Sequence, residues 1–136
     1  LGGITFDDPV TSMEYLAKLY HSLNSEIKQG NPELWQRYLS LAAAPRGISC
    51  EFCCGLGAYG VTPDGRLMCG CKHQPALLAV TMGLMKNTDY SDAEILKETM
   101  KWKTIWFPRN MVGLALEVAG TDPSSLQSLP GMVGGC

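Results

Sequence analysis

The sequence predicts a mostly α-helical protein: a small bundle of about five helices, with an irregular cysteine-rich loop or short hairpin between the second and third helices. Apolar residues recur at helical spacing over most of the chain, and prolines with capping residues mark where each periodic stretch begins. Residues 46–73 lack this periodicity and hold five of the six cysteines. We therefore expect one helical domain over 1–120 with a cysteine-rich insert at 46–73, followed by an extended C-terminal tail over 121–136.

The first two helices are predicted from matching start signals. Asp8 and Pro9 are typical of an N-cap and a first helical turn, and helical spacing of apolar residues continues to Gly30. The pair Asn31–Pro32 repeats this signal, and a second amphipathic helix follows until Pro45 stops it. The apolar positions that we expect to face the core in the first helix are Met13, Leu16, Leu19, Tyr20, Leu23 and Ile27.

Three more helices follow the insert. The third begins near Gln74 and is apolar nearly all round over Leu77–Met85, so we expect it to form the buried centre. A capping box at Ser91–Glu94 starts the fourth helix, which Pro108 ends. A short fifth helix is predicted over Asn110–Ala119. The tryptophans are most simply core residues: Trp35, Trp102 and Trp106.

The insert has the composition of turns. Glycines and a Pro-Asp-Gly turn at 63–65 replace the helical pattern. The flanking residues 58–61 and 66–68 are able to pair as a short hairpin about that turn.

Charge and length exclude several classes of function. The chain has 136 residues and a net charge of −2, and its basic residues form no stripe that would mark a nucleic-acid surface. It holds no apolar run of the roughly 20 residues that a membrane span needs. Because the chain begins with Leu1 instead of methionine, we expect that a leader or a membrane anchor has been removed.

The cysteines of the insert have the spacing of metal ligands. Cys50 and Cys53 match a metal knuckle, in which a turn points two sulfurs at one ion. Cys54 is adjacent to Cys53, so the two side chains usually point away from each other. Cys54 would therefore bind a second ion or bridge two ions more easily than complete the tetrahedron around the ion that Cys50 and Cys53 bind. Cys69 and Cys71 alternate along the chain, which places both side chains on one side of an extended segment.

Two further residues complete the predicted site. His73 continues the alternation just before a helix N-terminus, where partial positive charge favours a nearby thiolate. Cys136 ends a glycine-rich tail that we expect to cross the bundle and reach the insert, as a ligand or as a disulfide partner. The other histidine, His21, is expected to be a surface or packing residue.

This donor set exceeds what one structural zinc ion requires, which is four ligands. The surplus favours a soft-metal site, with copper(I) ahead of an iron–sulfur cluster and zinc as a further alternative. Such a site serves storage, delivery or electron transfer. The predicted ligands are Cys50, Cys53, Cys54, Cys69, Cys71, His73 and Cys136.

Two other interpretations remain open at the level of sequence. The six cysteines are able to form three disulfides, which would make the chain an extracellular module stapled by covalent bonds. Cys50 and Cys53 are also spaced as a redox pair for thiol–disulfide exchange or sulfur transfer, although the helix start that usually follows such a pair is missing. No motif of another enzyme class is present.

Residues 48–108 resemble a group of uncharacterised archaeal and bacterial proteins. The shared features are the Cys-Glu-aromatic-Cys-Cys-Gly segment from Cys50, the Cys-Gly-Cys-x-His segment ending at His73, and a helix that ends in Trp-Lys and Phe-Pro at Pro108. The resemblance implies an extracytoplasmic protein, often tethered by an N-terminal hydrophobic segment, and implies no activity. This chain departs from the group after the histidine, where Gln74 begins a different sequence.

Overall fold

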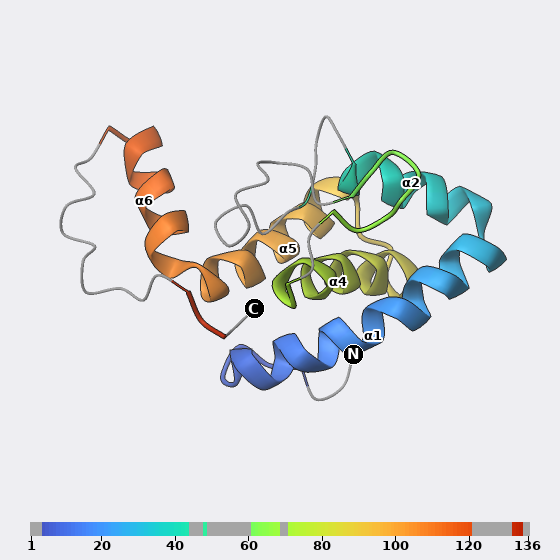
Figure 1. Ribbon diagram of the computed structural model, residues 1–136. Helices are drawn as coiled ribbons and strands as arrows, with labels where there is room; N and C mark the ends of the chain where they lie inside the picture. The colour runs from blue at the N-terminus through green and yellow to red at the C-terminus, as the bar shows by residue number, and fades with distance from the viewer. Residues whose placement is uncertain (1–3, 44–47, 49–60, 69–70, 121–131, 135–136) are drawn as a thin grey trace.

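The computed structural model describes residues 4–43, 48, 61–68, 71–120 and 132–134. These residues contain five helices and no strand, which confirms the predicted fold class. The first four helices pack around a shared core (Figure 1). Their bounds are α1 Pro9–Gly30, α2 Pro32–Ala42, α4 His73–Asn87, α5 Asp92–Trp106 and α6 Pro108–Val118.

Local capping fixes where the first two helices begin. The Asp8 carboxylate accepts a hydrogen bond from the backbone N–H of Thr11 at 3.2 Å, and the Asn31 side chain accepts one from Leu34 at 3.1 Å. Both bonds satisfy backbone donors that a helix start leaves without an intrahelical partner. The start signals read from the sequence are therefore confirmed for α1 and α2.

Helix α4 is the centre of the bundle, as its apolar sequence predicted. It packs against α1, α5 and α2, and twelve of its fifteen residues are buried. Its polar Thr81 is satisfied inside the core, because the hydroxyl donates to the Leu77 carbonyl and lies 3.2 Å from the Thr99 hydroxyl of α5.

The boundary between α5 and α6 differs from the prediction in one detail. The last helix begins at Pro108 and not at Asn110. Pro108 both ends α5 and occupies the first turn of α6, where its missing N–H has no intrahelical partner to lose. Phe107 alone separates the two helices, and it is buried. Helix α6 extends away from the rest of the bundle (Figure 1).

The described part of the insert contains the turn that the sequence predicted. Val61 and Leu67 form an isolated antiparallel bridge, and the Thr62 N–H donates to the Arg66 carbonyl at 2.9 Å. Gly65 has a φ of +90° and approaches Trp35 so closely that a Cβ there would lie 2.5 Å from the indole ring. The turn is thereby packed on α2, while residues 58–60 lie outside the described part of the chain.

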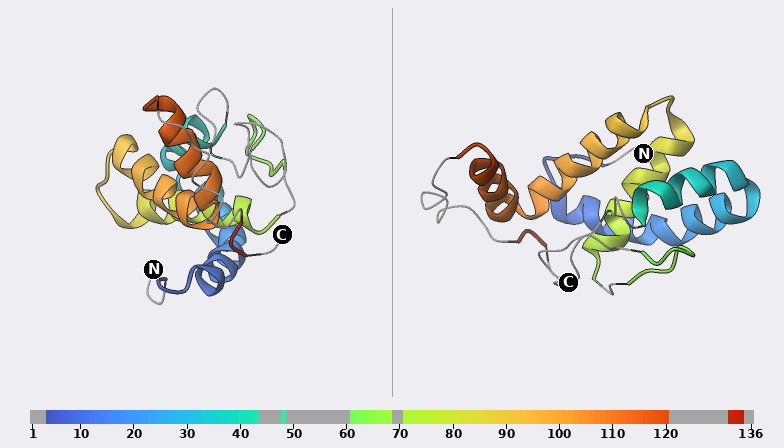
Figure 2. Two further views of the ribbon diagram at one scale, coloured as in Figure 1. Left: turned by 90° about the vertical axis from the view of Figure 1, so that its left-hand side faces the viewer. Right: turned by 90° about the horizontal axis from the view of Figure 1, so that it is seen from above.

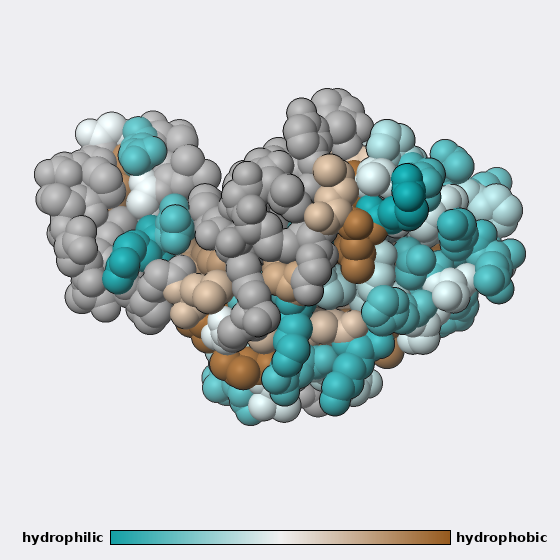
Figure 3. All heavy atoms as spheres, viewed as in Figure 1, coloured by the Kyte–Doolittle hydropathy of each residue, from teal (hydrophilic) through white to brown (hydrophobic). Residues whose placement is uncertain are grey.

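Hydrophilic residues cover much of the outer surface of α1 and α2 (Figure 3). Within the described ranges, no helix combines the length and the apolar character that a bilayer span requires.

The capping box of α5 yields a first testable prediction. The Ser91 hydroxyl accepts from the Glu94 N–H, and the Ser91 N–H donates to the Glu94 carboxylate at 2.7 Å, which lowers the pKa of that carboxyl. We expect Ser91→Ala to reduce the free energy of unfolding by about 1 kcal/mol. A carboxyl with a lowered pKa stabilises the fold above its unfolded pKa and loses this effect as the pH falls through the folded pKa.

Thermal melting of wild type, Ser91→Ala and Glu94→Ala between neutral and acidic pH tests this prediction. The loss in Ser91→Ala should largely remain at acidic pH, because the missing hydroxyl accepted from a backbone N–H and alanine keeps the Ser91 N–H that donates to the carboxylate. The loss in Glu94→Ala should shrink as the wild-type Glu94 carboxyl becomes protonated, and a loss that stays constant over the whole range would show that the bond to the carboxylate contributes nothing.

Candidate metal site at the start of the central helix

Two of the predicted ligands lie at the first turn of α4. His73 is the first residue of the helix and is fully buried, and Cys71 lies two residues before it with 7% of its surface exposed. The N-terminus of a helix carries partial positive charge, which favours the thiolate form of a nearby cysteine. The fold thus places a buried cysteine and a buried histidine at the start of one helix, where a thiolate is electrostatically favoured.

The hydrogen bond of His73 identifies which ring nitrogen carries the proton. Nε2 lies 2.9 Å from the backbone carbonyl oxygen of Val133. A carbonyl oxygen only accepts hydrogen bonds, so Nε2 is the donor and carries the hydrogen. In the neutral imidazole the lone pair is then on Nδ1. Phe107 and Trp106 pack against the ring, with centroids 4.8 and 5.8 Å away, and hold its orientation.

The C-terminal tail reaches this histidine from the far end of the sequence. The Val133 N–H donates to the Trp106 carbonyl at 2.7 Å, so this one residue bonds to both α5 and His73. Gly134 follows with a φ of +82°, and a Cβ there would lie 2.8 Å from the Met13 methyl carbon. Residues 132–134 accordingly lie beside the start of α4 (Figure 2).

We expected the tail to cross the bundle; its described residues 132–134 contact the end of α5, the start of α4 and Met13 of α1. Cys136, which we expected this path to bring to the insert, lies outside the described residues. Four more predicted ligands also lie outside them: Cys50, Cys53, Cys54 and Cys69. Within the part of the chain that the structure describes, no group of three or more His, Cys, Asp or Glu side chains is arranged to hold a metal.

The entrance to the insert is fixed to the same turn of α4. The buried side chain of Gln74 donates through Nε2 to the Ile48 carbonyl at 2.7 Å, and the Ile48 N–H donates to the Ala42 carbonyl at 3.2 Å. Ile48 precedes the first cysteine of the insert by two residues. Sequence reasoning missed this role of Gln74, because its partner is a backbone carbonyl that leaves no signal in the sequence.

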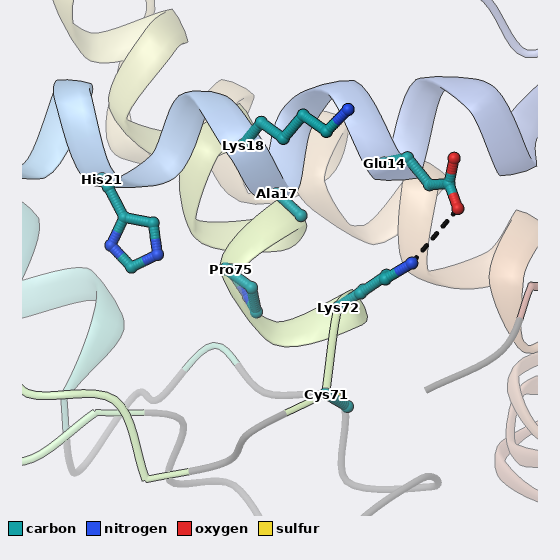
Figure 4. Close-up of a pocket in the computed structure, with 7 residues that line it drawn as sticks. All are labelled: Glu14, Ala17, Lys18, His21, Cys71, Lys72 and Pro75. Atoms are coloured by element: carbon teal, nitrogen blue, oxygen red, sulfur yellow. Dashed lines mark hydrogen bonds and ion pairs between the residues drawn. The ribbon is translucent and has the colours of Figure 1, made fainter.

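A cavity of about 440 Å³ opens between α1 and the start of α4 (Figure 4). Cys71 contributes to its wall, and so does His21, which the sequence placed on the surface. That expectation is correct for exposure, since the ring is exposed and packs edge-on against Tyr20 at 5.2 Å. His21 lies across the cavity from α4 because α1 packs on α4. No local feature of the sequence indicates this position. The lining residues are Glu14, Ala17, Lys18, His21, Cys71, Lys72 and Pro75.

No protein-family model matches this chain, and searches of curated proteins and of solved structures likewise return no match.

Proposed function

We propose that this chain binds a thiophilic metal ion or metal cluster at the start of α4, copper(I) ahead of iron–sulfur, for storage, delivery or electron transfer. One observation carries the proposal. Three segments distant in sequence are held at one helical turn: the entrance of the insert at Ile48, the pair Cys71 and His73, and the tail at Val133. Each segment contains or directly precedes a predicted ligand.

Chain connectivity supports this convergence. Cys50 follows Ile48 by two residues, Cys69 precedes Cys71 by two, and Cys136 follows Gly134 by two. Two residues of extended chain span at most about 7 Å. Three further sulfurs are therefore tethered within a short reach of the turn that bears Cys71 and His73.

The chemistry of His73 fits a ligand. Histidines that bind metals through one ring nitrogen commonly donate the other N–H to a carboxylate or a backbone carbonyl, which fixes the tautomer and the ring orientation. His73 makes this kind of bond from Nε2 to Val133, so Nδ1 is the nitrogen that would bind the metal. Thiolates with one imidazole form the soft donor set that copper(I), iron–sulfur clusters and zinc accept. The complete proposed set is Cys50, Cys53, Cys54, Cys69, Cys71, His73 and Cys136.

The same convergence serves a second function, a disulfide-stapled extracellular module. Val133, three residues before Cys136, is bonded to His73, and the same convergence of segments serves a covalent bond as readily as a shared metal. The buried imidazole of His73 favours the metal site over the disulfide, because a histidine is able to bind a metal and takes no part in a disulfide bond. An extracytoplasmic location and a tether to the membrane belong to the proposal in either case.

Thiol counting and elemental analysis separate these two functions. We expect protein purified without oxygen to carry bound metal, and to release all six thiols when it is chelated and unfolded without reductant. A visible absorption band would identify iron–sulfur, whereas copper(I) thiolate absorbs in the ultraviolet and zinc is silent. Few titratable thiols together with no bound metal would overturn the metal site in favour of disulfides.

Cysteine variants then rank the ligands. We expect Cys71→Ser to lower the metal bound per chain, because Cys71 precedes His73 by two residues at the start of α4. The matched variant Cys54→Ser should lower it only if the site holds more than one metal ion. Unchanged metal content in Cys71→Ser would remove this residue from the site.

A further inference from the structure

The cavity between α1 and α4 has the size of a site for a small molecule. Its volume of about 440 Å³ falls within the range of 300–1,000 Å³ that is typical of ligand pockets. Both walls are helical, with Ala17 and His21 on α1 and Pro75 on α4, so the shape is set by helix packing. In Figure 4 the His21 side chain points from α1 toward the side of α4, the Lys72 ammonium meets the Glu14 carboxylate, and Lys18 extends along α1.

The cavity carries excess positive charge. Two lysines, Lys18 and Lys72, line it together with a single carboxylate, Glu14. The carboxylate is already used, because Glu14 pairs with the Lys72 ammonium at 3.2 Å. Among the residues that the structure describes, no carboxylate pairs with Lys18. One cation thus remains uncompensated in a hollow between two helices, where it attracts an anion.

Cys71 connects this cavity to the proposed metal site. It lines the cavity, and His73, two residues later, is buried and bonded to the tail through Val133. A ligand that enters the cavity from the solvent would therefore meet the proposed metal site at Cys71, whose sulfur is a preferred ligand of soft metals. This step of the argument rests on the proposed function.

We propose that the cavity receives the metal as an anionic complex with a small thiol that bears carboxylate groups, and that Cys71 takes the metal over from it. Copper(I) held by two thiolates has a net charge of −1 before any carboxylate is counted. Such a complex matches the uncompensated Lys18 in charge. The cavity also has room for the small thiol beside the cysteine.

The transfer is a ligand exchange without a change of oxidation state. A bond forms between copper(I) and the Cys71 sulfur, and the bond between copper(I) and one sulfur of the small thiol breaks. The proton of the Cys71 thiol leaves with the released thiol. No oxidant or reductant takes part.

Stopped-flow transfer of copper(I) from two donors tests the proposal: the anionic glutathione complex and the cationic acetonitrile complex. We expect Lys18→Glu to slow transfer from the glutathione complex about tenfold at low ionic strength, with the effect fading as salt is added. The same variant should not slow transfer from the acetonitrile complex. The final amount of copper per chain should equal that of the wild type.

Lys28→Glu is the matched control, because it makes the same change of charge on the same helix. Lys28 lies over the Trp35 ring, 5.5 Å from its centroid, and does not line the cavity. It should change both rates much less than Lys18→Glu does, because ten residues of helix place it about 15 Å along α1 from Lys18. Equal slowing of both donors in Lys18→Glu, or no slowing of either, would overturn the cavity as the receiving site. A wild type that retains copper from neither donor would instead overturn the proposed function, and this inference with it.

Discussion

Replacing Gly134 with alanine is expected to release the tail from the bundle, while the same replacement at Gly120 leaves it in place. Both glycines have left-handed backbone, with φ of +82° and +76°, so alanine meets the same backbone strain of about 1–2 kcal/mol at either position. Their surroundings differ. A Cβ at Gly134 would lie 2.8 Å from the Met13 methyl carbon, whereas nothing lies within 4 Å of one at Gly120.

The atom that would clash is the end of a flexible methionine side chain, and burial limits how far it can move away. Met13 is 1% exposed and belongs to the core between α1 and its neighbours. Overpacking of this kind typically costs about 1–3 kcal/mol, in addition to the backbone strain. In its described residues 132–134 the tail is held by the N–H and carbonyl bonds of Val133 and by modest apolar burial, so we expect it to detach. The loss of stability is then limited to what docking of the tail contributes.

Hydrogen exchange of the Val133 amide measures the release directly, because that amide donates to the Trp106 carbonyl. We expect its protection to fall sharply in Gly134→Ala and to stay at the wild-type level in Gly120→Ala. The double variant Met13→Ala with Gly134→Ala removes the clash and should recover part of the protection, as a double-mutant cycle would show. Equal protection in both single glycine variants would mean that the tail does not depend on this close approach.

Helices were predictable because their signals are local. Asp8, Asn31 and Ser91 each cap a helix through a partner three residues away, so the bond that starts the helix lies within the stretch that encodes it. The buried position of α4 followed from its uniform apolar composition. The start of α6 was misplaced because a proline ends one helix and begins another with the same chemistry, and Phe107 is the only residue between them.

The arrangement of the site was only partly predictable, for a physical reason. Its decisive bonds join side chains to backbone carbonyls far along the chain: His73 to Val133 across 60 residues, and Gln74 to Ile48 across 26. Every residue has a carbonyl, so composition and spacing give no sign of which one is used. The position of His21 opposite Cys71 is likewise a product of the packing of α1 on α4.

The proposed role of His73 is tested most sharply by a pair of amide variants. The side-chain nitrogen of His73→Gln reaches about the position of Nε2, so it is able to donate to the Val133 carbonyl while offering no nitrogen ligand in place of Nδ1. The shorter His73→Asn places its amide near Nδ1 and loses the bond to Val133. The first variant therefore separates holding the tail from binding the metal.

We expect His73→Gln to keep the tail docked and to lose metal affinity by at least about 100-fold, since loss of an outer partner alone costs about 10–100-fold. His73→Asn should lose both metal affinity and the protection of the Val133 amide. Competition with a chelator of known strength measures the affinity, and hydrogen exchange of Val133 reports the tail. A His73→Gln protein with wild-type affinity would make this histidine a purely structural contact between α4 and the tail. The convergence of Cys71, the insert and the tail would then have to be explained by the cysteines alone. That result would favour the disulfide-stapled module over the metal site.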